Sequence, residues 1–188
     1  MHKITLSFLS VILLTVTFIS CDSKSLNSSK AITAIEAYME TQPIYESTTF
    51  TVGDTKLRTR KDAALIEQYK QLADEGYLNL ADFNTKKRFM SKDSLWQGTI
   101  KLTGKAHPYV LEQKGNKIKV KTIEYLVDKD NGFQLDAKGK KTATATVKLK
   151  KNPTPFHFLK EDKSPNTEFI TRKFKMKYTE ETGWRITK

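Results

Sequence analysis

Two sets of residues have the types and spacing to do chemistry. One is Cys21, the only cysteine, at the end of an uncharged apolar run, and a lone thiol cannot form an internal disulfide. The other is a set of lysines that alternate with other residues along extended segments, so that they should share one side of each strand. These are Lys117, Lys119, Lys121, Lys148, Lys150, Lys173, Lys175 and Lys177. Such a face would attract an anionic partner, such as lipid head groups, other phosphate groups or an acidic protein.

The N-terminal segment has the pattern of a secretory signal peptide. A short basic start precedes the apolar residues 4–19, which are fewer than the roughly 20 that a membrane-spanning helix needs. The segment ends in Phe18-Ile19-Ser20-Cys21. This box resembles that of bacterial lipoproteins, in which a small residue precedes the cysteine that becomes the lipid-bearing first residue. Ser20 fits the small position, while Phe18 stands where an aliphatic residue is usual.

The lipoprotein resemblance implies cleavage before Cys21 and acylation of that residue, for example with palmitate. One acyl chain binds a membrane only reversibly, whereas several form a stable tether. Residues 1–20 would be the signal peptide, residues 21–29 the lipidated cysteine and a polar leash about 25 Å long when extended, and residues 30–188 a single domain. The resemblance places the protein at the cell membrane or the outer membrane, facing the periplasm or the exterior.

Composition excludes several function classes. The chain carries 33 Lys and Arg against 21 Asp and Glu, with a formal net charge of +12, and its mean hydropathy is -0.54, which excludes a multi-span membrane protein. With one cysteine and three histidines, we expect no metal centre and no cofactor. There is no Gly-x-Ser-x-Gly elbow and no glycine-rich phosphate loop, so we expect no enzyme. His107 and His157, beside proline and phenylalanine, should be packed or surface imidazoles.

Helical spacing marks two segments in the first half of the mature chain. After Ser28 or Ser29, either of which could cap, apolar residues recur until Pro43: Ile32, Ile35 and Met39. Residues 44–52 then have the composition of a strand. Thr59 and Asp62 have the spacing of a capping box. It would start a second helix, which ends at Gly76 and has one apolar face: Leu65, Ile66, Tyr69, Leu72 and Ala73.

From about Lys86 the pattern changes to period two, which predicts strands. Four dipeptides mark turns: Gly115-Asn116, Asn131-Gly132, Gly139-Lys140 and Thr182-Gly183. Two strands show a clear apolar face, with Ala143, Ala145, Val147 and Leu149 inward in one and Ile170, Phe174, Met176 and Tyr178 inward in the other. A phase switch after Val120 predicts a bulge near Thr122, and Trp184 and Ile186 indicate a last strand. The predicted fold class is α+β, with two N-terminal helices packed on a strongly antiparallel meander sheet.

Two further resemblances concern the mature domain. A helix, a meander and the closing Gly183-Trp184-Arg185-Ile186 look like the cystatin-like and nuclear-transport-factor-like domains of small envelope lipoproteins. Residues 72–78 and 100–105 are similar to the second helix and wing of winged-helix regulators, which implies nucleic-acid binding. Export argues against that activity because DNA regulators are cytoplasmic, so we expect no nucleic-acid partner.

The expected function is a lipid-anchored, non-enzymatic binding or adaptor module of the cell envelope, held at the membrane by acylated Cys21. Three alternatives stay open. The lysines could form a solvated sheet face that only prevents aggregation. The protein could be an immunity or inhibitor protein that neutralises an envelope-targeting toxin. It could also hydrolyse an envelope polymer, which would need two carboxylates roughly 5 to 9.5 Å apart in a cleft.

Overall fold

The computed structural model describes residues 25–160, 162 and 164–187, so Cys21 and the expected signal peptide lie outside the described residues. The helices are α1 (Ser28–Thr41) and α2 (Ala63–Asp74), with short 3-10 helices η1 (Gly104–Tyr109) and η2 (His157–Leu159). The strands are β1 (Tyr45–Thr51), β2 (Gly53–Arg58), β3 (Leu78–Lys87), β4 (Ser94–Leu102), β5 (Val110–Lys114), β6 (Lys117–Val127), β7 (Gln134–Ala137), β8 (Thr142–Pro153), β9 (Phe169–Thr179) and β10 (Gly183–Thr187). The predicted α+β class with antiparallel pairing is confirmed.

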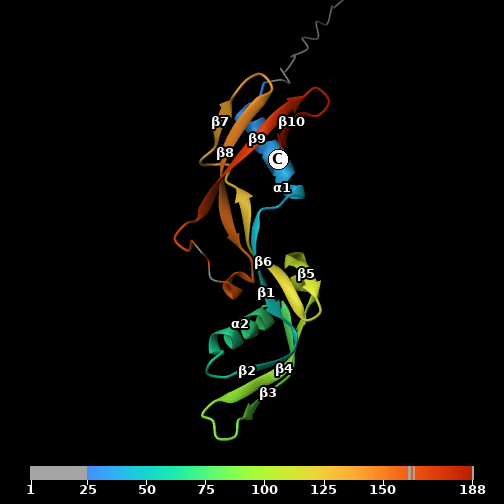
Figure 1. Ribbon diagram of the computed structural model, residues 1–188, viewed down its shortest axis with the longest axis vertical. Coiled ribbons are helices and arrows are strands. Elements are labelled where there is room, and N and C mark those ends of the chain that lie inside the picture. The colour runs from blue at the N-terminus through green and yellow to red at the C-terminus, as the bar shows by residue number, and fades with distance from the viewer. Residues whose placement is uncertain (1–24, 161, 163, 188) are drawn as a thin grey trace, which may run out of the picture.

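The strands form two sheets instead of the single meander that we expected. A seven-stranded sheet has the order β1-β6-β8-β9-β10, with β5 paired to β6 and β7 to β8, and a three-stranded sheet has the order β2-β4-β3. The strand predicted over residues 44–52 is confirmed as β1, whereas β2 and most of β3, which precede the change to period two at Lys86, were not predicted. In Figure 1 the molecule is elongated, with α1 and β7 to β10 at one end and α2 and β2 to β4 at the other.

Three of the four predicted turns join neighbouring strands of a hairpin: β5 to β6, β7 to β8, and β9 to β10. The turn at Asn131-Gly132 does not. Both β6 and β7 pair with β8, one after the other along the same strand, so the chain between them continues the edge and does not reverse it. The backbone N–H of Asp128 donates to the Lys148 carbonyl, and that of Lys148 donates to the Gly132 carbonyl. These two bonds hold the connecting loop against β8.

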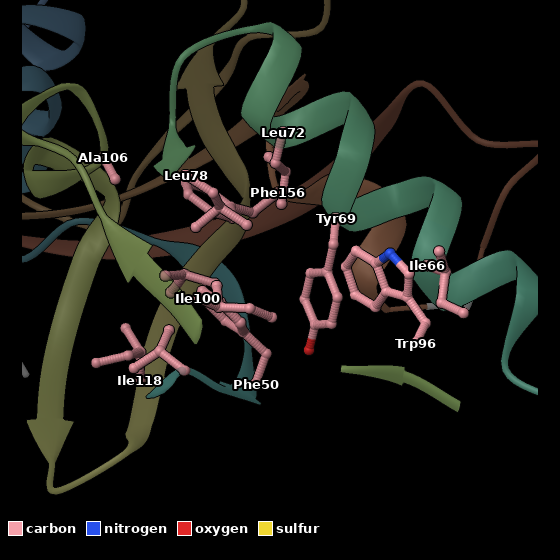
Figure 2. Packing of buried hydrophobic residues seen from close by; sticks show 12 residues of the cluster. Phe50, Ile66, Tyr69, Leu72, Leu78, Trp96, Ile100, Ala106, Ile118 and Phe156 are labelled. Atoms are coloured by element: carbon pink, nitrogen blue, oxygen red, sulfur yellow. The ribbon is translucent and has the colours of Figure 1, made fainter. Parts of the chain in front are cut away.

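Each helix covers its own hydrophobic cluster. The first cluster lies under α2 and between the two sheets, and Figure 2 shows Ile66, Tyr69 and Leu72 projecting from α2 into it. Its buried residues are Phe50, Val52, Ile66, Tyr69, Leu72, Leu78, Trp96, Ile100, Ala106, Ile118, Val120 and Phe156. The second cluster lies between α1 and the far half of the seven-stranded sheet. Its buried residues are Ala31, Ile35, Met39, Ile123, Tyr125, Ala143, Ala145, Val147, Leu149, Phe174 and Met176.

Strand β6 belongs to both clusters, and the predicted bulge is confirmed at the point where it passes from one to the other. In the pairing with β1, Ser47 lies opposite Lys121 and Glu46 opposite Ile123, so Thr122 has no opposite residue. Residues of even number are buried before the bulge and residues of odd number after it. The irregular ladder is completed by Thr154, whose hydroxyl donates to the Lys121 carbonyl over 2.6 Å. The bulge thus lets one strand bury side chains in two successive cores.

The two predicted helices are confirmed, but their caps differ from the expectation. Asn27 caps α1, where its side chain accepts the Lys30 N–H over 2.9 Å, so neither Ser28 nor Ser29 is the cap. The capping box at Thr59 is wrong because α2 begins at Ala63. The Thr59 hydroxyl donates instead to Asp93 over 2.8 Å, which is a contact between distant parts of the chain. Tertiary hydrogen bonding therefore overrides the local capping pattern.

The predicted faces of the two clearest strands are confirmed. Ala145, Val147 and Leu149 of β8 are fully buried, and Phe174 and Met176 of β9 are buried beside them. The lysines of both strands consequently point to the other side of the sheet.

We predict that Val147→Asp unfolds the protein, because an unpaired charge in an apolar layer costs several kcal/mol against a total stability of about 5 to 15 kcal/mol. Thr146→Asp is the matched control, since Thr146 is the next residue, faces outward and lies opposite Lys173. Thermal melting followed by circular dichroism should show loss of the transition in the first variant and a near-normal transition in the second. Equal melting of both would mean that the strand faces are assigned incorrectly.

Candidate anion-binding surface

The eight predicted lysines all lie on the outward side of the seven-stranded sheet, opposite the buried residues. Five of them are on β8 and β9, and three are on the first half of β6. The strand register brings the first five together, whereas the three on β6 pair with β1 and β5 and lie in a different part of the sheet.

The lysines of β8 and β9 form a continuous cationic surface. Across the two strands, Lys173 and Lys175 lie opposite Thr146 and Thr144, so the short threonine side chains leave the ammonium groups exposed. The hairpin to β10 adds Arg185, which lies opposite Lys177. We call this surface the basic face: Lys148, Lys150, Lys173, Lys175, Lys177 and Arg185. Sequence reasoning missed Arg185, although its position between the inward Trp184 and Ile186 was a signal for it.

Within the described part of the chain, no residue of the basic face makes an ion pair. The strands β7 to β10 contain a single carboxylate residue, Asp136, which lies at the edge opposite Thr144. Lys150 lines an open pocket with Asp128, Asp130 and Glu168, whereas no carboxylate residue lies on β8, β9 or β10 themselves. Several cations on one surface with few carboxylate neighbours add to a potential that attracts anions.

Lys148 differs from the other members of the basic face because its stem is packed. Its ammonium lies 4.5 Å from the centre of the Phe169 ring. Its stem crosses Gly132, whose positive φ of 77° and lack of a side chain leave the space that Lys148 fills. The loop before β7 therefore fixes the position of this cation.

Two of the three lysines of β6 have a carboxylate beside them, in contrast to the basic face, while Lys117 lies opposite Lys114. Lys121 pairs with Glu124 over 2.7 Å, and Lys119 lies opposite Glu112. The Lys114 ammonium, 2.7 Å from the Glu112 carboxylate, holds the pKa of that carboxylate below its usual value by hydrogen bonding and by charge. The net attraction for anions at β6 is consequently smaller.

A second cluster of charged groups lies behind the sheet, near the bulge. The Tyr125 hydroxyl donates to Glu46 over 2.8 Å, and the Lys160 ammonium lies 3.3 Å from the same carboxylate. The Lys151 side chain is 8% exposed and pairs with Asp162 over 2.7 Å. Each carboxylate is thus occupied by a neighbour in the same protein. These contacts hold the segment after β8 against the sheet and are structural in character.

An open groove of about 590 Å³ lies between the second half of α1 and the end of β6. Met39, Pro43, Ile44 and Leu126 give it an apolar floor, and carboxylates form its rim: Glu36, Glu40 and Glu124. Lys129 pairs with Glu36 over 2.8 Å at this rim. The charge of the groove is opposite to that of the basic face, so the two surfaces suit different ligands.

The structure gives a local role to one histidine. His157 is exposed, and its Nδ1–H donates to the Thr154 carbonyl over 2.8 Å, which orders the turn of η2. Among the described residues there is no group of three side chains suited to hold a metal ion. In the same part of the chain, no helix has the length and apolar character needed to cross a membrane. No protein-family model, curated protein or solved structure matches this chain.

The Tyr125–Glu46 contact predicts a pH dependence of stability. Burial, together with the hydrogen bond and charge of Glu46, raises the pKa of Tyr125 to about 12, from about 10 in an unfolded chain. The neutral hydroxyl is favoured in the folded state, so its contribution is complete below about pH 10 and is lost as the pH rises toward about 12. Urea unfolding should therefore show a shallower decline over this window for Tyr125→Phe than for the wild type. Equal slopes would contradict the assignment.

Proposed function

We propose that this protein is a lipid-anchored, non-enzymatic binding or adaptor module of the cell envelope, and that it holds an anionic envelope component on its basic face. The observation that carries the proposal is the set of six outward cations on β8, β9 and β10 with no ion-pair partner among the described residues. A face that served only to keep the sheet soluble would not need three neighbouring strands, β8 to β10, without a carboxylate residue.

The form of the basic face favours an extended anionic surface over a small ligand. The side chains stand in rows across paired strands, and none of them lines a closed pocket. Near an anionic membrane each such charge contributes about 1 kcal/mol, and the attraction falls off within a Debye length of about 8 Å at physiological salt. Several cations in one plane can act together only on a partner that is also extended.

The position of the chain start supports a tether on the same end of the molecule. In Figure 1 the described chain enters beside the hairpins of β7 to β10, and α1 begins at Ser28. If Cys21 is acylated, the few residues before Asn27 form the leash. Its extended length of about 17 Å keeps the basic face close to the membrane that holds the lipid. This membrane would be the cell membrane or the outer membrane, with the protein facing the periplasm or the exterior.

An immunity or inhibitor protein is the second candidate, because an acidic toxin surface would also fit the basic face. A hydrolase is not proposed, because two of the three carboxylates that line the groove, Glu36 and Glu124, are each paired with a lysine, and Glu40 is then left without a second unpaired carboxylate in the groove. Binding to lipid vesicles separates the first candidate from the second, because an inhibitor has no need for lipid.

We predict that changing Lys173, Lys175 and Lys177 to Gln weakens binding of the soluble chain, residues 22–188, to anionic vesicles by tenfold or more. Each lost cation removes about 1 kcal/mol of attraction. This part of the chain contains every residue of both hydrophobic clusters. Vesicle co-sedimentation measures the binding, and thermal melting should stay near that of the wild type.

The matched control for this triple variant changes the same number of lysines on β6: Lys117, Lys119 and Lys121 to Gln. It alters the net charge equally, but at a part of the sheet where Glu124 and Glu112 lie beside Lys121 and Lys119. We expect a much smaller effect on binding. If both variants bind equally weakly, net charge and not the basic face is responsible.

We predict that Cys21→Ala abolishes both lipid attachment and cleavage after residue 20, because the proposed processing acts on the thiol. Radiolabelled palmitate and the mass of the mature chain report the two steps. Equal labelling of variant and wild type would remove the lipoprotein assignment without affecting the fold or the basic face.

A further inference from the structure

The loop between β3 and β4 exposes two large apolar side chains. Phe89 and Met90 are 94% and 92% exposed, far more than the other large apolar residues that the structure describes. They belong to neither hydrophobic cluster and contribute nothing to the packing of the domain. Side chains of this size gain free energy when they leave water, so their full exposure at a hairpin tip indicates a contact outside the protein.

Cations surround these two side chains. Lys86 and Lys87 end β3, Arg88 precedes Phe89, and Lys92 follows Met90 by two residues. All four are exposed, and none of them makes an ion pair with another described residue. The tip therefore presents two apolar side chains among four cations. We call these four cations the collar: Lys86, Lys87, Arg88 and Lys92.

The nearest carboxylate is directed away from the tip. Asp93 accepts the Thr59 hydroxyl over 2.8 Å and the backbone N–H groups of Arg60 and Ser94 over 3.0 and 2.9 Å. Desolvation raises the pKa of Asp93, but these hydrogen bonds and the charge of Arg60 outweigh it and lower the pKa. Asp93 thus fixes the base of the loop to the chain before α2 and leaves the collar uncompensated.

The hairpin that carries the tip is stiff. The rings of Phe83 and Trp96 stack at 3.8 Å between centroids. Gly98 permits this stack, because a Cβ at that position would lie 2.6 Å from the Phe83 ring. Trp96 is also buried in the cluster under α2, so it anchors the hairpin to the hydrophobic core. A rigid support reduces the conformational entropy lost when the tip binds.

The tip and the basic face are separate surfaces. Figure 1 places the β3–β4 hairpin at the end of the long axis opposite to α1 and β8 to β10. An interaction at the tip is consequently independent of the one proposed for the basic face.

We propose that the hairpin tip is a membrane-insertion element, which places Phe89 and Met90 in the interface of an anionic bilayer while the collar contacts lipid phosphates. A bilayer interface accepts apolar side chains without a shaped pocket and pairs with the surrounding lysines and arginine. The long lysine stems can extend along the apolar layer while their ammonium groups stay at the phosphates. The alternative partner would be another protein with a groove that receives the tip.

Insertion is tested with a tryptophan reporter at the tip. Phe89→Trp is prepared in residues 22–188, the part that contains both cores, and mixed with phosphatidylcholine–phosphatidylglycerol vesicles whose acyl chains carry bromine. We expect a blue shift and quenching of the new tryptophan. Phe169→Trp is the matched control, because Phe169 is a partly exposed aromatic beside the basic face, which should approach head groups without insertion. Binding without quenching of Phe89→Trp would overturn the proposal.

The vesicle affinities of variants distinguish the contribution of the tip from that of the basic face. The double variant Phe89→Ser, Met90→Ser should weaken vesicle binding by about tenfold or more for each side chain lost and leave melting unchanged. Leu126→Ser, which removes another exposed apolar side chain, should not. If the tip variant binds like the wild type while the Lys173, Lys175, Lys177 triple variant does not, the tip proposal fails and the proposed function stands. Absence of wild-type binding to these vesicles, or selective capture of an envelope protein by the tip, also overturns insertion.

Discussion

The β-bulge at Thr122 joins the two halves of the structure. At this point of β6 the buried residues change from even to odd numbers. In a strand that alternates strictly, residues of even and odd number face opposite sides of the sheet. Strand β6, however, buries Ile118 and Val120 in the cluster under α2 and Ile123 and Tyr125 in the cluster under α1, all on one side of the sheet. The extra residue, Thr122, allows both pairs to face the same side, but it leaves polar groups that need other partners. The Thr122 hydroxyl is buried with no hydrogen-bond partner among the described residues, and Thr154 is needed to complete the backbone ladder.

The same alternation that builds the second core also creates the basic face. On β9, burying Phe174 and Met176 against α1 leaves Lys173, Lys175 and Lys177 no other side to occupy. The arrangement therefore links stability and the proposed binding: the inward residues hold the strand, and the strand holds the cations in register. At the other end of the molecule the stacked Phe83 and Trp96 give the β3–β4 tip a comparable support. The two proposed contact surfaces thus rest on different cores.

Local pattern was sufficient for the features that local geometry determines. The two helices, the faces of β8 and β9 and the bulge followed from spacing alone, because each depends on neighbours within one element. Pairing between distant segments did not follow: nothing local indicates that β1 joins β6, or that Asp93 binds the Thr59 hydroxyl and leaves α2 to begin at Ala63. For the site, spacing predicted which lysines face outward but not which are compensated. Lys121 has Glu124 beside it only because the bulge turns both outward. The tip did not follow from the sequence, because nothing local indicates that Phe89 and Met90 stay outside both hydrophobic clusters.

The proposed function requires that the basic face holds this protein on an anionic surface by charge. Its most direct test is the dissociation constant of residues 22–188 for anionic vesicles, measured across a series of salt concentrations with uncharged vesicles alongside. We expect binding to the anionic vesicles alone, and this binding should weaken steadily as salt shortens the Debye length from about 10 Å at 0.1 M toward 3 Å at 1 M. Binding that is absent, or that is indifferent to salt and to lipid charge, would contradict it.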